Sequence, residues 1–201
     1  MKIVDVKVSE PLFLTLRPLA DARNYVYGPR SWAFVHVLTD EGITGISPIS
    51  PSNELIALLN GVLKDTIVGE DPFDFEKTWD KMYWRTYGGG RRGLVLLAIS
   101  AVDIAIWDII GKACGKPIHK LLGGYRVRVP AYASGINLNF TVDELVKQSI
   151  EFVRQGFKAV KMKIGKRDPK EDLERVKAVR DAIGYDIALM VDVNGVWSVN
   201  T

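Results

Sequence analysis

Cysteine is almost absent from this sequence of 201 residues, with Cys114 as its one example. A single cysteine excludes an internal disulfide, so packing must hold the fold together. No apolar run approaches the ~20 residues that a membrane span needs, and we expect no membrane partner. The first five residues also lack the long apolar stretch of a signal peptide, which predicts a cytoplasmic protein.

A strong excess of charge of either sign is missing as well, because the formal net charge is +3 at pH 7. The densest basic stretch, residues 158–170, has no interleaved aromatic side chain beyond Phe157 that could stack on bases. We therefore expect no nucleic-acid partner. Hydrophobic residues make up 47% of the chain, which is ample for the core of a globular protein.

Two short apolar runs, residues 160–164 and 190–194, carry polar residues at alternate positions. Side chains two apart on a strand share a face, which groups Lys161 with Lys163 and Asp192 with Asn194. A helix is predicted between the runs, so they would form parallel strands of a βαβ unit. The carboxyl ends of these strands would then bring two amines and a carboxylate together.

A competing interpretation places Lys161 and Lys163 on the solvated face of an antiparallel sheet. Parallel strands, in contrast, are normally covered on both faces, so charges on them point into a barrel interior or a site. Two ammonium groups ~6.5–7 Å apart on one strand would repel by about 2.4 kcal/mol at an effective dielectric near ~20. That repulsion favours the neutral lysine that general-base catalysis requires.

Residues 1–124 predict an α+β domain. Strands are expected near residues 4–8, 32–38 and 43–49, the last two as a hairpin, with helices over residues 53–64, 71–83 and 94–111. The second helix would have Asp71 as its N-cap. In the apolar third helix, Asp103 and Asp108 are expected to be structural and to bind Arg or backbone N–H groups.

A polar loop over residues 16–30 carries Arg17, Arg23 and Tyr25. These side chains are interpreted either as ordinary surface or as a flap over an anionic substrate, and the residues alone leave both readings open.

From residue 125 the pattern changes to alternating strands and helices. Strands are expected over residues 127–133, 158–164 and 187–193, with helices over 141–155 and 168–183. The second helix has an apolar stripe of Leu173, Val176, Val179 and Ile183. The order fits a doubly wound sheet or the start of a (β/α)8 barrel, and no glycine fingerprint of a dinucleotide fold follows any strand.

A complete barrel takes ~250 residues, so residues 125–201 would form an incomplete barrel domain, truncated after its third strand. The expected architecture is thus an α+β capping domain over residues 1–124 followed by the first strands of a modified (β/α)8 TIM-type barrel.

Several runs together resemble one known family. The segments are residues 100–108 (SAVDIAIWD), 111–112 (GK), 115–117 (GKP), 121–124 (LLGG), 161–163 (KMK) and 192–194 (DVN). In combination they resemble the enolase superfamily, and specifically its mandelate racemase and muconate-lactonizing enzyme branch. The resemblance covers the whole chain and implies a capping (lid) domain, a modified barrel, a Mg²⁺ cofactor and abstraction of the proton α to a carboxylate.

The resemblance also implies roles for individual residues. Lys163 would be the base, Lys161 a cation beside the substrate carboxylate, and Asp192 the first Mg²⁺ ligand. The residues expected to contact substrate are Asn194, Tyr132 and Ser134 at the strand ends, and Arg17, Arg23 and Tyr25 in the flap. The family's other two metal carboxylates and its His–Asp pair would lie beyond Thr201, because His36 and His119 match no catalytic position.

These observations predict an enzyme that forms an enolate from a small-molecule carboxylate, as a sugar-acid or hydroxy-diacid dehydratase within a homo-oligomer. The alternative is a racemase or epimerase of a 2-hydroxy acid or related carboxylate. A different class of interpretation is a catalytically incomplete fragment that retains lid and oligomer contacts, and the 201-residue chain alone is expected to be inactive. A Schiff-base aldolase using Lys161 or Lys163 is disfavoured by residues 192–194.

Overall fold

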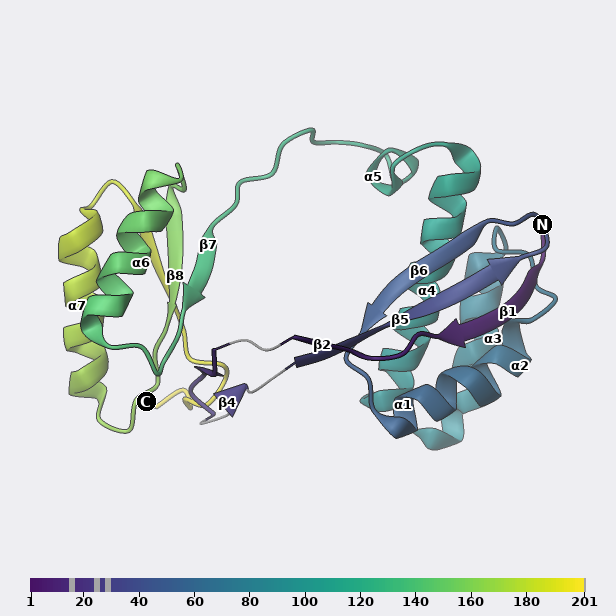
Figure 1. The fold of residues 1–201 in the computed structure, drawn as a ribbon, viewed down its shortest axis with the longest axis horizontal. Coiled ribbons are helices and arrows are strands. Elements are labelled where there is room, and N and C mark those ends of the chain that lie inside the picture. The colour runs from purple at the N-terminus through teal and green to yellow at the C-terminus, as the bar shows by residue number, and fades with distance from the viewer. Residues whose placement is uncertain (15–16, 24–25, 28–29, 201) are drawn as a thin grey trace. The chain divides into compact units, whose positions relative to one another are not determined.

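The computed structural model describes residues 1–14, 17–23, 26–27 and 30–200. It divides into two compact units, unit 1 with Met1–Leu14 and Arg30–Val127, and unit 2 with Thr15–Pro29 and Arg128–Thr201. Residues 17–23, which interrupt unit 1 in the sequence, therefore belong to the same unit as the parallel strands (Figure 1).

Unit 1 contains an antiparallel sheet centred on β5 (Arg30–Thr39). This strand pairs with β1 (Ile3–Val8), β2 (Leu12–Leu14) and β6 (Thr44–Ile49). The predicted hairpin of residues 32–38 and 43–49 is confirmed, with Val35 opposite Ser47. Gly42 in its turn has a φ of 79°, a conformation that glycine adopts without steric cost.

Helices cover one face of this sheet (Figure 1). The helices of the unit are α1 (Asn53–Leu58), the π-helical η1 (Leu59–Leu63), α2 (Lys64–Ile67), α3 (Phe75–Thr86), the 3₁₀ helix η2 (Tyr87–Gly89), α4 (Leu94–Cys114) and α5 (Ile118–Leu121). The predicted N-cap at Asp71 is wrong, because α3 begins four residues later and Asp74 is its N-cap. Asp71 instead accepts a hydrogen bond from the backbone N–H of Phe73 within the preceding turn.

The core of unit 1 lies between the sheet and α4. Alternate residues of β5, Ala33, Val35 and Val37, are fully buried with Val102 and Ile106 of α4. By length and composition α4 is apolar enough to cross a membrane, contrary to the expectation that no apolar run approaches that length. Half of its apolar window is buried inside the protein, which is the pattern of a core helix.

Unit 2 contains three parallel strands, β7 (Ala133–Ile136), β8 (Ala159–Lys163) and β9 (Ala188–Asp192). The parallel prediction is confirmed, but the first strand begins at Ala133 and not at residue 127. Two helices, α6 (Val142–Arg154) and α7 (Pro169–Ile183), cover one face (Figure 1). A short antiparallel pair, β3 (Leu19–Ala20) and β4 (Val26–Tyr27), completes the unit.

Local signals explain where these helices begin. Thr141 and Glu144 form the capping box of α6, in which each side chain accepts a hydrogen bond from the other residue's backbone N–H. Asp168 caps α7 through the N–H of Lys170, with Pro169 at the first helical position. The helices bury the face of β8 that carries Val160 and Met162. The opposite face of β8 carries Lys161 and Lys163.

Candidate active site

Lys161, Lys163 and Asp192 meet at the carboxyl ends of β8 and β9. The register pairs Lys163 directly with Asp192. The Nζ atoms of Lys161 and Lys163 lie 2.9 and 2.7 Å from the same carboxylate oxygen, Asp192 Oδ2. Both lysine side chains are 20% exposed. The predicted convergence of two amines and a carboxylate is therefore present on one face of the sheet.

Asn194 holds this cluster from the turn that follows β9. Its backbone N–H donates to Asp192 Oδ1 at 2.9 Å, and its side-chain Oδ1 accepts from Lys163 Nζ at 2.9 Å. The residue has a φ of 51°, a left-handed conformation that asparagine tolerates better than most residues. Both oxygens of Asp192 and the ammonium of Lys163 are thus oriented by hydrogen bonds.

The ionisation of Asp192 follows from these contacts. Hydrogen bonds from Lys163, from the backbone of Asn194 and from Lys161 hold its pKa well below the usual range for a carboxyl. From the sequence alone, only the repulsion between two ammonium groups is expected. In the structure both ammonium groups contact the same carboxylate, which offsets their mutual repulsion.

Tyr132 and Ser134 border the cluster on the β7 side. Lys161 Nζ lies 5.7 Å from the centroid of the Tyr132 ring, within reach of a cation–π interaction. Ser134 is the register partner of Lys161 and is exposed. Both positions are therefore open to a ligand held by Lys161, and their contact with substrate stays a prediction.

The predicted flap residues lie elsewhere in unit 2. Arg17 donates to Glu144 Oε1 at 2.7 Å and stacks over the Phe140 ring at 4.5 Å. Arg23 pairs with the buried Asp21, with 2.6 Å between Nη2 and Oδ2. Tyr25 lies outside the described residues. The proposed contacts of these three residues with substrate remain predictions.

Sequence reasoning missed a buried ion pair on α7. Asp172 and Arg175 are each 4% exposed. Asp172 Oδ2 accepts the N–H groups of Gly165 and Lys166, both at 2.8 Å. The i,i+3 spacing of Asp172 and Arg175 on the inward face of α7 was the available signal in the sequence. The predicted apolar stripe instead included Leu173, which is 70% exposed.

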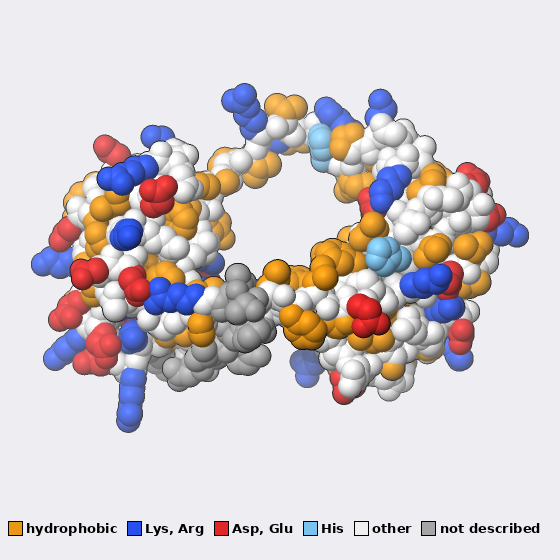
Figure 2. Space-filling view, viewed as in Figure 1, with side chains coloured by type: hydrophobic (Ala, Val, Ile, Leu, Met, Phe, Trp, Pro, Cys, Tyr) orange, Lys and Arg blue, Asp and Glu red, His pale blue; other side chains and the backbone are white. Residues whose placement is uncertain are grey.

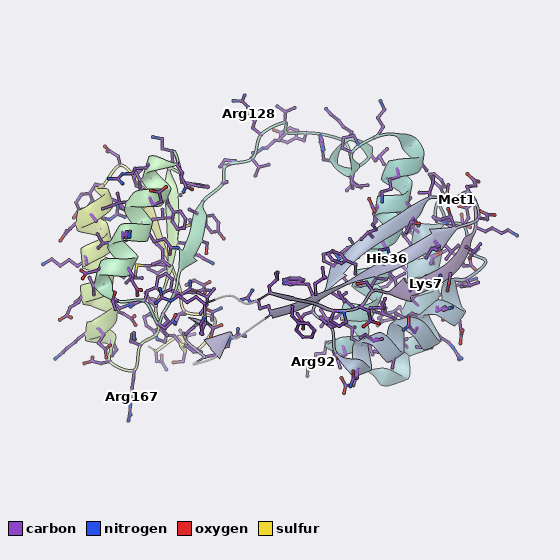
Figure 3. The ribbon with its side chains drawn as sticks, viewed as in Figure 1. Met1, Lys7, His36, Arg92, Arg128 and Arg167 are labelled. Atoms are coloured by element: carbon purple, nitrogen blue, oxygen red, sulfur yellow. The ribbon has the colours of Figure 1, made fainter. Side chains whose placement is uncertain are left out.

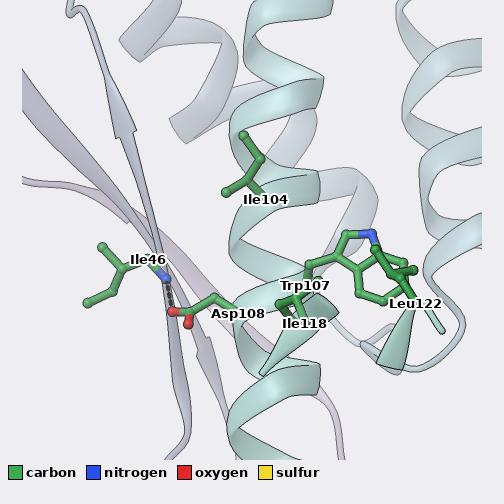
Figure 4. Close-up of a pocket in the computed structure, with 6 residues that line it drawn as sticks. All are labelled: Ile46, Ile104, Trp107, Asp108, Ile118 and Leu122. Carbon is green, nitrogen blue, oxygen red and sulfur yellow. Dashed lines mark hydrogen bonds between the residues drawn. The ribbon is translucent and has the colours of Figure 1, made fainter. Parts of the chain in front are cut away.

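An apolar hollow of about 430 Å³ in unit 1 is a weaker candidate (Figure 4). It is lined by Ile46, Ile104, Trp107, Asp108, Ile118 and Leu122. Its one carboxylate, Asp108, accepts the backbone N–H of Ile46 at 2.9 Å and pairs with Lys112 at 2.6 Å. The structural role predicted for Asp108 is thus confirmed. Asp103 is half-buried, and burial raises the pKa of its carboxyl.

The chain offers Mg²⁺ only part of a site. This ion prefers near-octahedral coordination by oxygen, and Asp192 supplies a carboxylate of the right kind. Across residues 1–14, 17–23, 26–27 and 30–200, no group of three or more His, Cys, Asp or Glu side chains could hold a metal. The residues present therefore fit Mg²⁺ as the source of one carboxylate ligand and do not complete its coordination.

On the face seen in Figure 2, positively and negatively charged side chains are interspersed in both units, and no patch of a single sign is visible.

The geometry of unit 2 defines the class of site. Lysines and a carboxylate lie at the carboxyl ends of parallel strands, which is where barrel enzymes carry their active sites.

Family models support this class over most of the chain. The model for the mandelate racemase / muconate lactonizing enzyme N-terminal domain matches residues 3–123. The model described as enolase C-terminal domain-like matches residues 144–201. The chain belongs to the mandelate racemase and muconate-lactonizing enzyme branch of the enolase superfamily, which confirms the resemblance seen in the sequence.

Individual relatives cover the same region. A 3,6-anhydro-alpha-L-galactonate cycloisomerase from Streptomyces coelicolor is 40% identical over 83% of this chain and 47% of its own length. Arabinonate dehydratase from Saccharolobus solfataricus is 40% identical over 73% of this chain and 40% of its own length. The chain thus spans about half the length of the curated relatives it matches.

A solved structure extends the likeness to the fold. A racemase from Streptomyces coelicolor A3(2), crystallised with bound magnesium, has a TM-score of 0.92 and 36% identity, covering 98% of this chain and 57% of that one. Its metal supports Mg²⁺ as the cofactor of this group of proteins. An N-terminal capping domain and a partial barrel are the corresponding architecture of this chain.

Proposed function

We propose that this chain forms part of an enzyme that abstracts the proton α to a carboxylate to give an enolate, most specifically as a sugar-acid dehydratase. The observation that carries the proposal is the cluster of Lys161, Lys163, Asp192 and Asn194 on two adjacent parallel strand ends. The names of relatives, among them a sugar-acid dehydratase, support the choice of substrate class.

The chemistry explains why these residue types belong together. Removing an α-proton places a second negative charge beside a carboxylate, so cations at the carboxylate oxygens stabilise the transition state. In the proposal Lys161 supplies one such charge, with Tyr132 limiting its movement. Asp192 would hold Mg²⁺ in part, and the ion would supply further positive charge to stabilise the enolate.

Lys163 is the proposed base, and a base must be neutral when it accepts the proton. Lys163 Nζ donates to Asp192 Oδ2, so in the proposal this contact is exchanged for one with substrate. Asn194 Oδ1 can keep Lys163 in place during that change, because it accepts from the same Nζ. Asp192 would be a ligand of Mg²⁺, and Lys163 would then keep its contact with Asn194.

The second candidate function is racemisation or epimerisation, which shares the enolate and differs in where the proton returns. The cycloisomerase and racemase relatives support racemisation or epimerisation as this second candidate. A third possibility is a non-catalytic role for the chain alone, because it matches only about half the length of its relatives. We further propose a cytoplasmic homo-oligomer acting on a small-molecule carboxylate.

The test uses the 201-residue chain alone and the same chain extended by the barrel segment that follows the matched region in the arabinonate dehydratase. Each is incubated with Mg²⁺ and a panel of aldonates and aldarates in D₂O. Proton NMR follows loss of the α-proton, and a semicarbazide assay detects the 2-keto-3-deoxy product of dehydration.

We expect no reaction from the chain alone and a keto product from the extended protein. The exposed Lys158, which directly precedes β8, provides a matched control, since Lys158→Ala should retain activity that Lys163→Ala loses. Deuterium incorporation with inversion and no keto product would favour the racemase. Absence of exchange with every acid of the panel would contradict both enzymatic candidates.

A further inference from the structure

Residues 17–23, named here the strap, are fastened to unit 2 by a loop that follows β7. Asn139 in that loop contacts the strap at two points: its Nδ2 donates to the carbonyl of Pro18 at 2.8 Å, and its Oδ1 accepts the N–H of Ala20 at 3.0 Å. The N–H of the adjacent Leu138 donates to the carbonyl of Ala20 at 3.0 Å. One asparagine therefore pairs with the strap main chain as a neighbouring strand would.

The strap is buried where these contacts are made. Asp21 is 1% exposed, and Ala20 and Ala22 are also buried. A main-chain segment that leaves water must satisfy its N–H and C=O groups, which explains the need for a partner with both a donor and an acceptor. An asparagine amide carries both at one end of a short side chain, whereas aspartate lacks the donor and leucine lacks both.

A second contact brings the strap to the loop that leaves β8. Gly165 stands two residues after Lys163, and a Cβ there would lie 2.4 Å from Ala22 Cβ and 3.2 Å from Val193 Cγ2. Its φ of +111° is likewise unsuited to other residues. The strap therefore rests on the same strand ends that carry Lys163 and Asp192.

Two side chains of α7 hydrogen-bond to the loop that carries Asn139 and to the loop at Gly165. Arg175 donates to the carbonyls of Phe140 and Asn137 at 2.8 and 3.1 Å, which holds the loop that carries Asn139. Asp172 holds the loop at Gly165 through two backbone N–H groups. The two loops that contact the strap are thus held in place by two buried side chains of α7.

We propose that Asn139 is a positioning residue that anchors the strap over the strand ends, and that substrate binding at the Lys161–Lys163–Asp192 cluster depends on this anchor. Its effect on substrate rests on the proposed function, but the anchoring itself does not. The effect acts through the strap, since Asn139 bonds to the main chain of Pro18 and Ala20.

The first experiment measures amide hydrogen exchange by NMR in the 201-residue chain. In Asn139→Leu, which keeps the branched shape of the side chain and removes both of its hydrogen bonds, the amides of Ala20 and Leu138 should exchange about tenfold faster. The amides of Ile164 and Ala188, bonded within the β8–β9 region, should keep their rates. The exposed Asn60 in unit 1 gives the matched control, Asn60→Leu. Unchanged exchange at Ala20 and Leu138 in Asn139→Leu would overturn the anchor.

The second experiment measures steady-state kinetics of the extended protein described above. Asn139→Leu should raise KM about tenfold and leave kcat within about threefold, because the strap positions substrate without joining the proton transfer. Asn139→Asp should raise KM too, since it keeps one acceptor but loses the donor to Pro18. An unchanged KM together with faster Ala20 exchange would overturn the positioning role. An inactive wild-type protein would count against the proposed function, while the amide exchange still decides the anchor.

Discussion

Unit 1 and unit 2 each contain a sheet with one face under helices, but the other face differs between them. In unit 1, β5 buries Ala33, Val35 and Val37, and in unit 2, β8 buries Val160 and Met162 by the same alternation. The second face of β5 carries mixed side chains such as His36 (Figure 3), as antiparallel sheets commonly do. The second face of β8 carries Ala159, Lys161 and Lys163, and charged side chains there are unusual for parallel strands, which favours a site.

The two cores also differ in size. The hydrophobic cluster of unit 1 draws on a long central helix and a four-stranded sheet, whereas that of unit 2 rests on three strands and two helices. In addition, β9 is an edge strand with Val191 half-exposed. Because stability grows with buried apolar area, we expect unit 2 to unfold before unit 1. The proposed chemistry would then lie in the unit that is expected to be less stable.

The largest effect on stability is expected from a substitution that disrupts the tight packing of β6 against α4 in unit 1. In Gly45→Ala the new Cβ would lie 1.9 Å from the carbonyl oxygen of Ala105, so β6 and α4 would have to separate. We expect a loss of about 3 kcal/mol in the free energy of unfolding of unit 1. Gly88→Ala, with no atom within 4 Å of the new Cβ, should cost little. Urea unfolding followed by tryptophan fluorescence measures both, since all tryptophans but Trp197 lie in unit 1. Equal midpoints for the two variants would contradict the close approach.

A smaller effect is expected from the ion pair that supports unit 2. Arg175→Met would leave buried carbonyls and the Asp172 carboxylate without their guanidinium, at a cost of about 2 kcal/mol to unit 2. The matched control is Arg167→Met, because Arg167 points outward from unit 2 (Figure 3). Amide exchange resolves the two units, and protection in α4 should not change. A loss of protection in both units alike would mean that they do not unfold independently.

Magnesium binding to the 201-residue chain should be weak. Asp192 is one carboxylate, and its Oδ2 already accepts hydrogen bonds from two lysines with which a cation would compete. We expect calorimetry to give millimolar or weaker affinity, and no specific binding in Asp192→Asn. A micromolar dissociation constant would show that the chain holds a further set of ligands.

The smallest effect concerns the ion pair between the strap and α6. Arg17, together with the backbone N–H of Thr141, lowers the pKa of Glu144 to about 2. Because this pKa lies below that of the unfolded chain, the pair stabilises the fold at pH values above ~4.3 and that stabilisation is lost as the pH falls toward the folded pKa. Carbon-13 NMR of the carboxyl should show the low midpoint, and Arg17→Met should raise it. A midpoint near the ordinary value in the wild type would argue that Arg17 does not hold Glu144.

Much of the fold could be predicted because periodicity and caps are local signals. The hairpin of unit 1, the parallel strands of unit 2 and the Thr141–Glu144 capping box were all visible in the sequence. The start of α3 was misplaced because Asp71 and Asp74 both suit an N-cap. The start of β7 was misplaced because alternation over residues 127–133 does not show whether a partner strand is present.

The site was predictable where strand alternation determines which side chains share a face. Lys161, Lys163 and Asp192 follow from that rule, once the strands are parallel. The shared hydrogen bonds to Asp192 Oδ2 depend on register, and the positions of Arg17 and Arg23 depend on contacts distant in the sequence. Asp172 and Arg175 were missed because a buried ion pair on a helix has the same spacing as an exposed one.

If Lys163 and Asp192 serve one proton abstraction, stereospecific exchange of the α-proton in the extended protein must depend on both. Each epimer of the reactive acid is followed separately in D₂O by the loss of its α-proton signal. Lys163→Ala should abolish exchange for one epimer, and Asp192→Asn for both, because the charge that stabilises the enolate is needed whichever face loses the proton. Lys158→Ala should exchange as the wild type does. Undiminished exchange of both epimers in Lys163→Ala would rule out Lys163 as the base and leave it only a neighbour of Lys161.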